Sequence, residues 1–130
     1  MNSIAGGLVA VGVGAALGAW ARWGLGAWLN ERVANLPLGT LTANVVGGYL
    51  VGIAVAAFSQ RHDVPVEWRL FIVTGFLGGL TTFSTFSAEN VAMMMRSEYG
   101  AALLHAGAHL GGSLLATALG IATWRALVPA

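Results

Sequence analysis

Charged residues divide the chain into four long apolar runs. Met1–Ala21, Val33–Gln60 and Leu70–Ala88 carry no charged residue, and Tyr99–Trp124 is interrupted only by two histidines. A helix needs about 20 mainly apolar residues to cross the hydrocarbon core of a bilayer, and each run is long enough. The pattern therefore predicts four transmembrane helices, over about residues 4–29, 38–59, 68–95 and 100–126.

The prolines and the composition agree with this interpretation. Pro37, Pro65 and Pro129 fall between or after the runs, where helix boundaries are expected. The sequence is 57% hydrophobic and 8% charged, whereas a soluble domain carries about 25% charged residues. The first run lacks the positive start of a signal peptide, so we expect it to remain as a span. We predict an all-α integral membrane protein in which residues 1–130 form one four-helix domain with antiparallel neighbours.

Charge and motif content exclude several function classes. The formal net charge of +1 argues against nucleic acid, which requires a basic face. No G-x-S-x-G motif is present, and the few acidic residues provide few candidate catalytic groups for hydrolysis. The sequence therefore does not predict an enzyme.

The arginines give no preferred orientation in the membrane. The predicted topology places three at each end, and there is no lysine. One end holds Arg61, Arg69 and Arg125, and the other holds Arg22, Arg32 and Arg96. Because the positive-inside rule depends on such a bias, either other features fix one orientation or copies insert both ways. A chain this small has little room for an internal pathway, which favours an antiparallel, dual-topology homodimer.

Pairs of glycines four residues apart predict close helix packing. They are Gly14 with Gly18, Gly48 with Gly52, and Gly107 with Gly111.

The last predicted helix carries a polar stripe. His105, His109, Ser113 and Thr117 recur at i, i+4 spacing, so they share one face. Such groups either bond neighbouring helices or line a watery pathway. Two histidines in one line favour the pathway, to which Asn44 adds an amide. Neutral N–H and O–H donors suit an anion, whereas a cation pathway would prefer carboxylates or rings of carbonyls.

The spacing of His105 and His109 is also that of metal ligands on a helix. Zinc requires at least three protein ligands, and no glutamate lies between these histidines. A third ligand would have to come from another helix or subunit, so a metal site is the less favoured alternative.

Residues 78–90, GGLTTFSTFSAEN, predict a break near the middle of the third helix. Glycines weaken the helix, and Thr81 and Thr82 can bond backbone groups in its place. Carbonyls freed within a membrane need partners, and a cation is one of them. Phe83 and Phe86 share a face, and their rings either pack or present positive edges to an anion.

These residues resemble the Fluc family of fluoride channels, also called CrcB proteins. The resemblance rests on residues 78–90, on GTLTANVVGGYLVG at 39–52 and on GAWARW at 18–23, and it extends over essentially the whole chain. It implies a fluoride-selective channel for passive export of cytoplasmic fluoride. It further implies an antiparallel dimer with two pores in the inner or plasma membrane of a prokaryote.

The resemblance also implies roles for individual residues. Phe83 and Phe86 would contact fluoride through their ring edges, and Asn44 would be an amide donor to it. The carbonyls of Gly78 and Thr81 from both subunits would hold a structural sodium ion at the dimer centre. The polar track would include Ser84, Thr85, Ser113 and Thr117, and the pore entrances Arg22 and Glu89.

His105 and His109 depart from the family pattern. They take the first two places of a track that usually begins with tyrosine or another hydroxyl-bearing residue. Neutral imidazoles would replace those hydroxyls as donors. Two alternatives remain, a small dual-topology multidrug or cation transporter and a structural membrane subunit without a pore.

Overall fold

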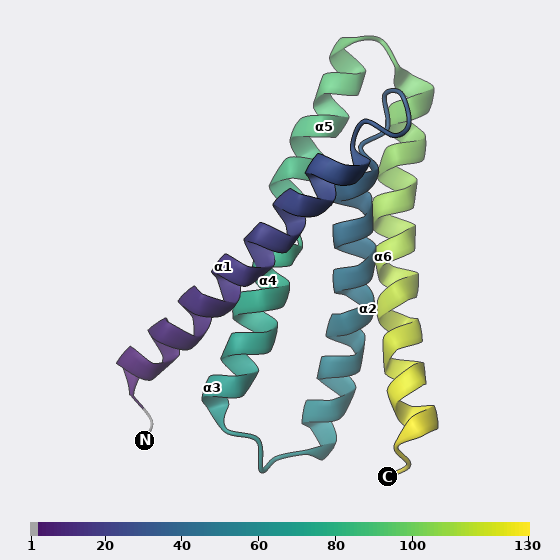
Figure 1. Cartoon of the computed structure of the whole chain (residues 1–130). Coiled ribbons are helices and arrows are strands. Elements are labelled where there is room, and N and C mark those ends of the chain that lie inside the picture. The colour runs from purple at the N-terminus through teal and green to yellow at the C-terminus, as the bar shows by residue number, and fades with distance from the viewer. Residues whose placement is uncertain (1–2) are drawn as a thin grey trace.

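The computed structural model describes residues 3–130, which are almost entirely helical (Figure 1). The elements are α1 (Ile4–Leu29), α2 (Leu38–Gln60), α3 (Val66–Arg69), the π-helix η1 (Leu70–Leu77), α4 (Gly78–Leu80), α5 (Phe83–Met95) and α6 (Tyr99–Leu127). Four helical segments are long and apolar enough to cross a membrane, and the third comprises α3, η1, α4 and α5. Their ends lie within two residues of the predicted ones.

Successive spans run in opposite directions (Figure 1). The start of α1, the end of α6 and the connection after α2 lie at one end, and the connections after α1 and α5 lie at the other. Helices α2 and α6 run side by side, and α1 crosses the η1–α4 segment obliquely. The arrangement thus brings the middle of α2, the start of α5 and the middle of α6 close together.

Two of the three predicted glycine pairs lie at helix contacts. A Cβ added to Gly14 or Gly18 would overlap the carbonyl oxygen of Phe71 or Phe76 in η1. A Cβ on Gly48 would lie 3.0 Å from the Ser113 carbonyl oxygen of α6. These glycines therefore allow α1 to approach η1, and α2 to approach α6.

The prediction for the third pair is wrong within this chain. A Cβ on Gly107 or Gly111 would meet nothing within 4 Å. The glycine of α6 that closely approaches the backbone of α2 is Gly120, where an added Cβ would lie 3.0 Å from the Ile53 nitrogen. Small residues at i, i+4 spacing also occur on faces that contact no other helix of the same chain.

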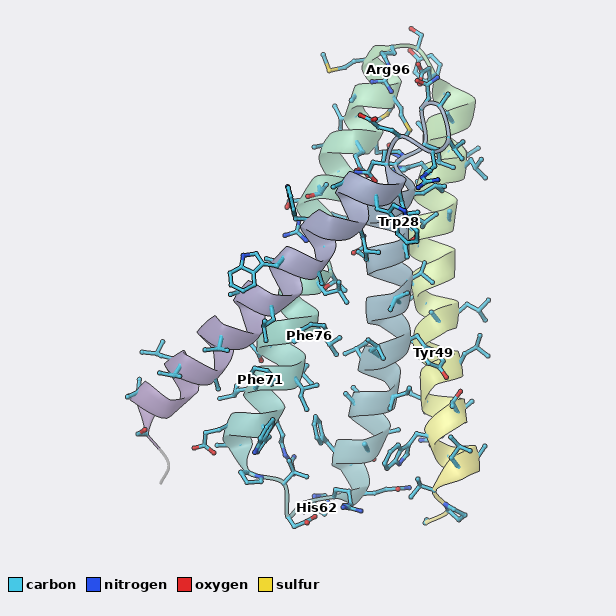
Figure 2. The ribbon with its side chains drawn as sticks, viewed as in Figure 1. Trp28, Tyr49, His62, Phe71, Phe76 and Arg96 are labelled. Carbon is cyan, nitrogen blue, oxygen red and sulfur yellow. The ribbon has the colours of Figure 1, made fainter. Side chains whose placement is uncertain are left out.

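The core is small, and most large apolar side chains face outward. Ala43, Ala54, Leu77 and Leu80 form the buried cluster, against which Phe76 packs (Figure 2). On the outer surface Trp23 is 76% exposed and Leu103 is 77% exposed. Such a surface requires an apolar covering, which a bilayer or another subunit provides.

Candidate functional site

The third span contains two non-helical residues, Thr81 and Thr82. Helix α4 ends at Leu80 and α5 begins at Phe83, and both threonines between them have extended backbone. The Thr82 hydroxyl caps α5 by accepting the Thr85 N–H at 3.1 Å. This is the usual role of an N-cap threonine, so the sequence of the motif explains where α5 starts.

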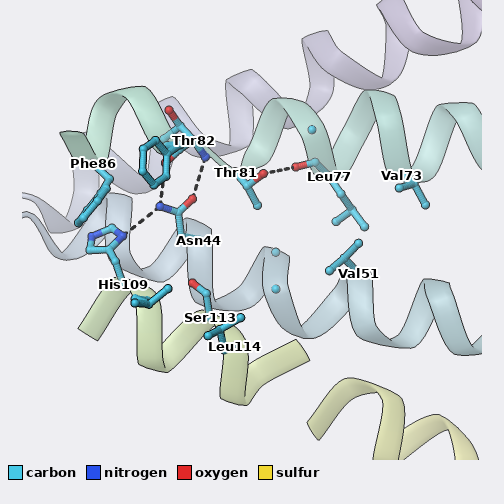
Figure 3. Close-up of a pocket in the computed structure, with 15 residues that line it drawn as sticks. Asn44, Val51, Val73, Leu77, Thr81, Thr82, Phe86, His109, Ser113 and Leu114 are labelled. Carbon is cyan, nitrogen blue, oxygen red and sulfur yellow. Dashed lines mark hydrogen bonds between the residues drawn. The ribbon is translucent and has the colours of Figure 1, made fainter. Parts of the chain in front are cut away.

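Asn44 of α2 bonds both backbone groups of Thr82 (Figure 3). Its Oδ1 accepts the Thr82 N–H at 2.7 Å, and its Nδ2 donates to the Thr82 carbonyl at 2.9 Å. In an unbroken helix that N–H would donate to the carbonyl of Gly78, four residues earlier. The Gly78 carbonyl therefore loses its helical donor, as the last carbonyls of any helix do.

A groove of about 420 Å³ opens beside this interruption. It brings together predicted site residues from three spans: Asn44, Gly78, Thr81, Phe83, Phe86, His109 and Ser113. The rest of its lining is mainly apolar, with side chains such as Leu77, Val73 and Val51 visible in Figure 3. The groove therefore combines a few neutral polar groups with two aromatic rings.

The two phenylalanines occupy different environments. The Phe83 side chain is 79% exposed, and its ring centroid lies 5.4 Å from that of Phe86. Phe86 stacks on His105 at 5.0 Å and lies 4.6 Å from the ring of His109. Phe86 thus connects the groove to the two histidines.

His105 and His109 are buried and form a cluster with Glu89 of α5. The two histidines are 1% and 5% exposed. His105 Nε2 lies 3.1 Å from Glu89 Oε1, and Thr40 Oγ1 donates to Glu89 Oε2 at 2.6 Å. One ligand-type atom from each of Glu89, His105 and His109 lies within 4.8 Å of the other two. The spacing of the two histidines did not identify a third metal ligand, and the Glu89 carboxylate lies where such a ligand would be needed.

Asn90 and Thr40 complete this cluster, although neither was among the predicted site residues. Asn90 Nδ2 donates to the Ala102 carbonyl at 2.8 Å and lies 3.0 Å from His105 Nδ1. Thr40 is the donor to Glu89. Asn90 ends the 78–90 motif, and an amide in an apolar span is itself a signal of a polar partner on a neighbouring helix.

The remaining predicted track residues make local or helix–helix bonds. Thr117 Oγ1 donates to the Gly48 carbonyl at 2.9 Å, which links α6 to α2. Thr82 Oγ1 lies 3.2 Å from Thr85 Oγ1 and 3.3 Å from Ser84 Oγ, beside the cap of α5. Thr117 therefore makes the helix–helix bond that was the less favoured interpretation of the stripe.

The charged residues predicted at the pore entrances lie on separate elements. Arg22 of α1 donates from Nε to the Gly79 carbonyl at 3.1 Å, and so satisfies a carbonyl at the end of α4. Glu89 belongs instead to the histidine cluster of α5 and α6.

Residues 9–121 match the sequence profile of the family described as CrcB-like protein, Camphor Resistance (CrcB). This chain belongs to the CrcB family. A relative from Cupriavidus pinatubonensis is 59% identical over 121 residues, which cover 93% of this chain and 96% of the relative. A relative from Cupriavidus metallidurans is 60% identical over the same shares. One from Chromohalobacter salexigens is 57% identical over 120 residues, 92% of this chain and 91% of the relative. All three are named fluoride-specific ion channel FluC. The CrcB match includes Asn44, the 78–90 motif and both buried histidines.

Proposed function

We propose that this CrcB protein is a fluoride-selective ion channel that exports cytoplasmic fluoride passively and so protects the cell from it. The observation that carries the proposal is close similarity, over nearly the whole chain, to relatives named as fluoride-specific channels. The groove adds chemical support, because its polar groups are neutral and the ring of Phe83 is exposed beside it.

Neutral donors and ring edges suit an anion that has to be bound and then released. An aromatic ring has a positive edge, which attracts an anion without carrying a formal charge. A fixed cation at the same place would attract the ion steeply in a medium of low dielectric constant and retain it. Phe83 and Phe86, which line the same groove as Ser113, provide the weaker attraction that passage requires.

The functional unit is proposed to be an antiparallel dual-topology homodimer with two pores in a prokaryotic plasma or inner membrane. Three arginines at each end of the bundle favour neither orientation. The groove is open along one side of the chain, and a second copy would enclose it and cover Phe83. The α4–α5 interruption would then lie near the middle of the bilayer.

The chemistry of the interruption fits a structural sodium ion. The carbonyls of Gly78 and Thr81, from both subunits, are proposed to hold it at the dimer centre. Gly78 and Thr81 line the open groove, and the Thr82 N–H that would pair with the Gly78 carbonyl binds Asn44 instead. Unwound backbone carbonyls are an established type of Na⁺ ligand in membrane proteins. The ion would neutralise their partial negative charges and join the two subunits.

Fluoride efflux from liposomes tests the proposed function. Purified protein is reconstituted, external fluoride is followed with a selective electrode, and chloride efflux is the matched control. Fluoride efflux without chloride efflux is the expected result. Absence of fluoride flux would favour the structural subunit, and transport of organic cations would favour the multidrug transporter.

Topology reporters fused to the C-terminus test the dimer separately. We expect signal on both sides of the membrane, because the arginine distribution gives neither orientation an advantage. Signal from one side only would exclude an antiparallel homodimer.

A further inference from the structure

The cluster of Glu89, His105 and His109 presents a choice between two ligands of opposite charge. A metal cation binds an unprotonated ring nitrogen, whereas an anion binds an N–H. The same three side chains serve either ligand, so their spacing alone does not decide between them. The decision depends on which nitrogen of each neutral ring carries the hydrogen, and the other nitrogen's partner determines that.

For His109 the partner is Asn44, whose amide orientation is fixed. Thr82 N–H requires an oxygen and the Thr82 carbonyl requires an NH₂ group, so the amide pairs with Thr82 in one orientation only. The second Nδ2 hydrogen lies toward His109 Nδ1, at 3.0 Å. Nδ1 is therefore an acceptor, and the hydrogen of the neutral ring is on Nε2.

For His105 the side-chain amide of Asn90 determines which ring nitrogen carries the hydrogen. The Ala102 carbonyl accepts from Nδ2 at 2.8 Å, which identifies that atom as the NH₂ group. Its other hydrogen lies toward His105 Nδ1 at 3.0 Å. The hydrogen of His105 is therefore on Nε2, from which it donates to Glu89 Oε1 at 3.1 Å.

The two N–H groups differ in one respect. The N–H of His105 is bonded to Glu89, whereas His109 Nε2 is the one fully buried side-chain nitrogen or oxygen in residues 3–130 without a hydrogen-bond partner. Leaving a buried donor unpaired is costly, so such a group is expected to have a ligand or an unplaced partner. Phe86 packs 4.6 Å from the same ring, so an aromatic side chain of the groove lies next to the histidine that carries this donor.

We propose that His109 donates its Nε2–H to fluoride in transit, and that Asn44 is a positioning residue that fixes this tautomer. The proposal rests on the proposed fluoride channel function and changes the donor expected from the family resemblance. Both hydrogens of the Asn44 amide are already bonded, one to Thr82 and one to His109. Asn44 therefore acts on the ion through His109.

The same tautomers disfavour a transition metal at this cluster. Coordination through Nε2 would move each ring hydrogen to Nδ1, where it would face the NH₂ group of Asn44 or Asn90. Two donors would then oppose each other at about 3 Å, and Asn44 can turn its amide only by losing both bonds to Thr82. One oxygen of Glu89 lies within 4.8 Å of one nitrogen of each histidine, and the negative charge of this carboxylate would speed release of an anion from His109.

Nitrogen-15 NMR of histidine-labelled protein in lipid bilayers tests the tautomers directly. His62→Gln removes the third histidine, which lies in the exposed connection after α2, and leaves two ring systems to assign. We expect Nε2–H tautomers for both rings. Added fluoride should shift the His109 Nε2–H and give a fluorine-19 contact to it, while His105 serves as the internal control. Chloride and Zn²⁺ should cause neither change.

Three results would overturn the inference: hydrogen on Nδ1 of His109, a fluorine contact to the Asn44 NH₂ group instead, or Zn²⁺ coordination by the two rings. The wild-type efflux assay keeps these failures separate from failure of the proposed function. Protein that conducts fluoride without a contact at His109 contradicts only the present inference.

A pair of variants adds a functional measurement. His109→Leu removes the donor and should reduce fluoride flux by about tenfold, the upper end of the effect of one hydrogen bond. His109→Gln supplies an amide N–H and should conduct faster than His109→Leu. Equal flux in both variants would show that size, and not the N–H, is what matters at this position. The dimer fraction of each variant is measured by size-exclusion chromatography so that only folded protein is compared.

Discussion

Replacing Glu89 with glutamine removes one charge beside His109 and keeps the shape of the side chain. The carboxylate accepts from His105 at Oε1 and from Thr40 at Oε2. In the variant the amide oxygen still accepts from His105, and the hydroxyl of Thr40 can turn to accept from the new NH₂ group. The change is therefore mainly electrostatic.

The size of the effect follows from the distance. One oxygen of Glu89 and one nitrogen of each histidine lie within 4.8 Å of one another, and we take the same separation, about 5 Å, for an anion bound at His109. Two like unit charges at that separation repel by about 3 kcal/mol at an effective dielectric constant of about 20. The Glu89 side chain is only 15% exposed, so solvent screens little of this repulsion. Each 1.4 kcal/mol is a factor of about ten in affinity, so Glu89→Gln should bind fluoride about 100-fold more tightly.

Efflux measured over a series of internal fluoride concentrations tests this prediction. Tighter binding should make the flux saturate at a lower concentration and reduce its maximum, because the ion leaves more slowly. Glu98→Gln is the matched control, since Glu98 lies in the connection before α6 and pairs with Arg96 at 3.0 Å. An unchanged or higher half-saturating concentration in Glu89→Gln would refute the reasoning that places fluoride next to this carboxylate.

Further predictions concern the rings, the ion and the helix packing. Phe86→Ile and Phe83→Ile keep apolar bulk but lose the ring edge, so efflux should fall while the dimer persists; wild-type efflux would mean that the rings only pack. Rigorous removal of Na⁺ should abolish flux, although Na⁺ itself should not cross; stoichiometric sodium–fluoride co-transport would contradict this. Gly75→Ala places a Cβ 2.9 Å from the Val11 carbonyl oxygen and should destabilise the protein by about 1–3 kcal/mol in denaturation, whereas Gly12→Ala, with nothing within 4 Å, should not.

The spans could be predicted from sequence because a bilayer imposes a simple rule on composition. Long charge-free runs bounded by proline or arginine determine where each helix starts and ends, and Gln60 and Val66 differ from the predicted limits by one and two residues. The two non-helical residues between α4 and α5 have a local cause, since glycines and threonines weaken a helix. The π-helix η1, in contrast, has no comparable signal in its apolar sequence.

The polar cluster could be predicted only in part because it depends on how separate helices rotate against each other. The i, i+4 spacing predicted that His105 and His109 share a face, and both are buried. Nothing in the spacing determined that Glu89 and Asn90 of another helix would meet that face. The same limit explains Thr117, which bonds a backbone carbonyl of α2 at a point where glycine lets the two helices approach.

The two hydrogen bonds between the Asn44 side chain and the Thr82 backbone have a consequence for engineering the channel. Substitution of Asn44 would remove the hydrogen bonds to two backbone groups of Thr82, so it would also destabilise the backbone between α4 and α5. His109 receives a bond from Asn44 but supports no backbone group through its side chain. With His109 as the proposed donor to the anion, substitution at position 109 should change anion preference without removing a bond to the backbone. A search for altered halide selectivity should therefore begin with a library at that single position.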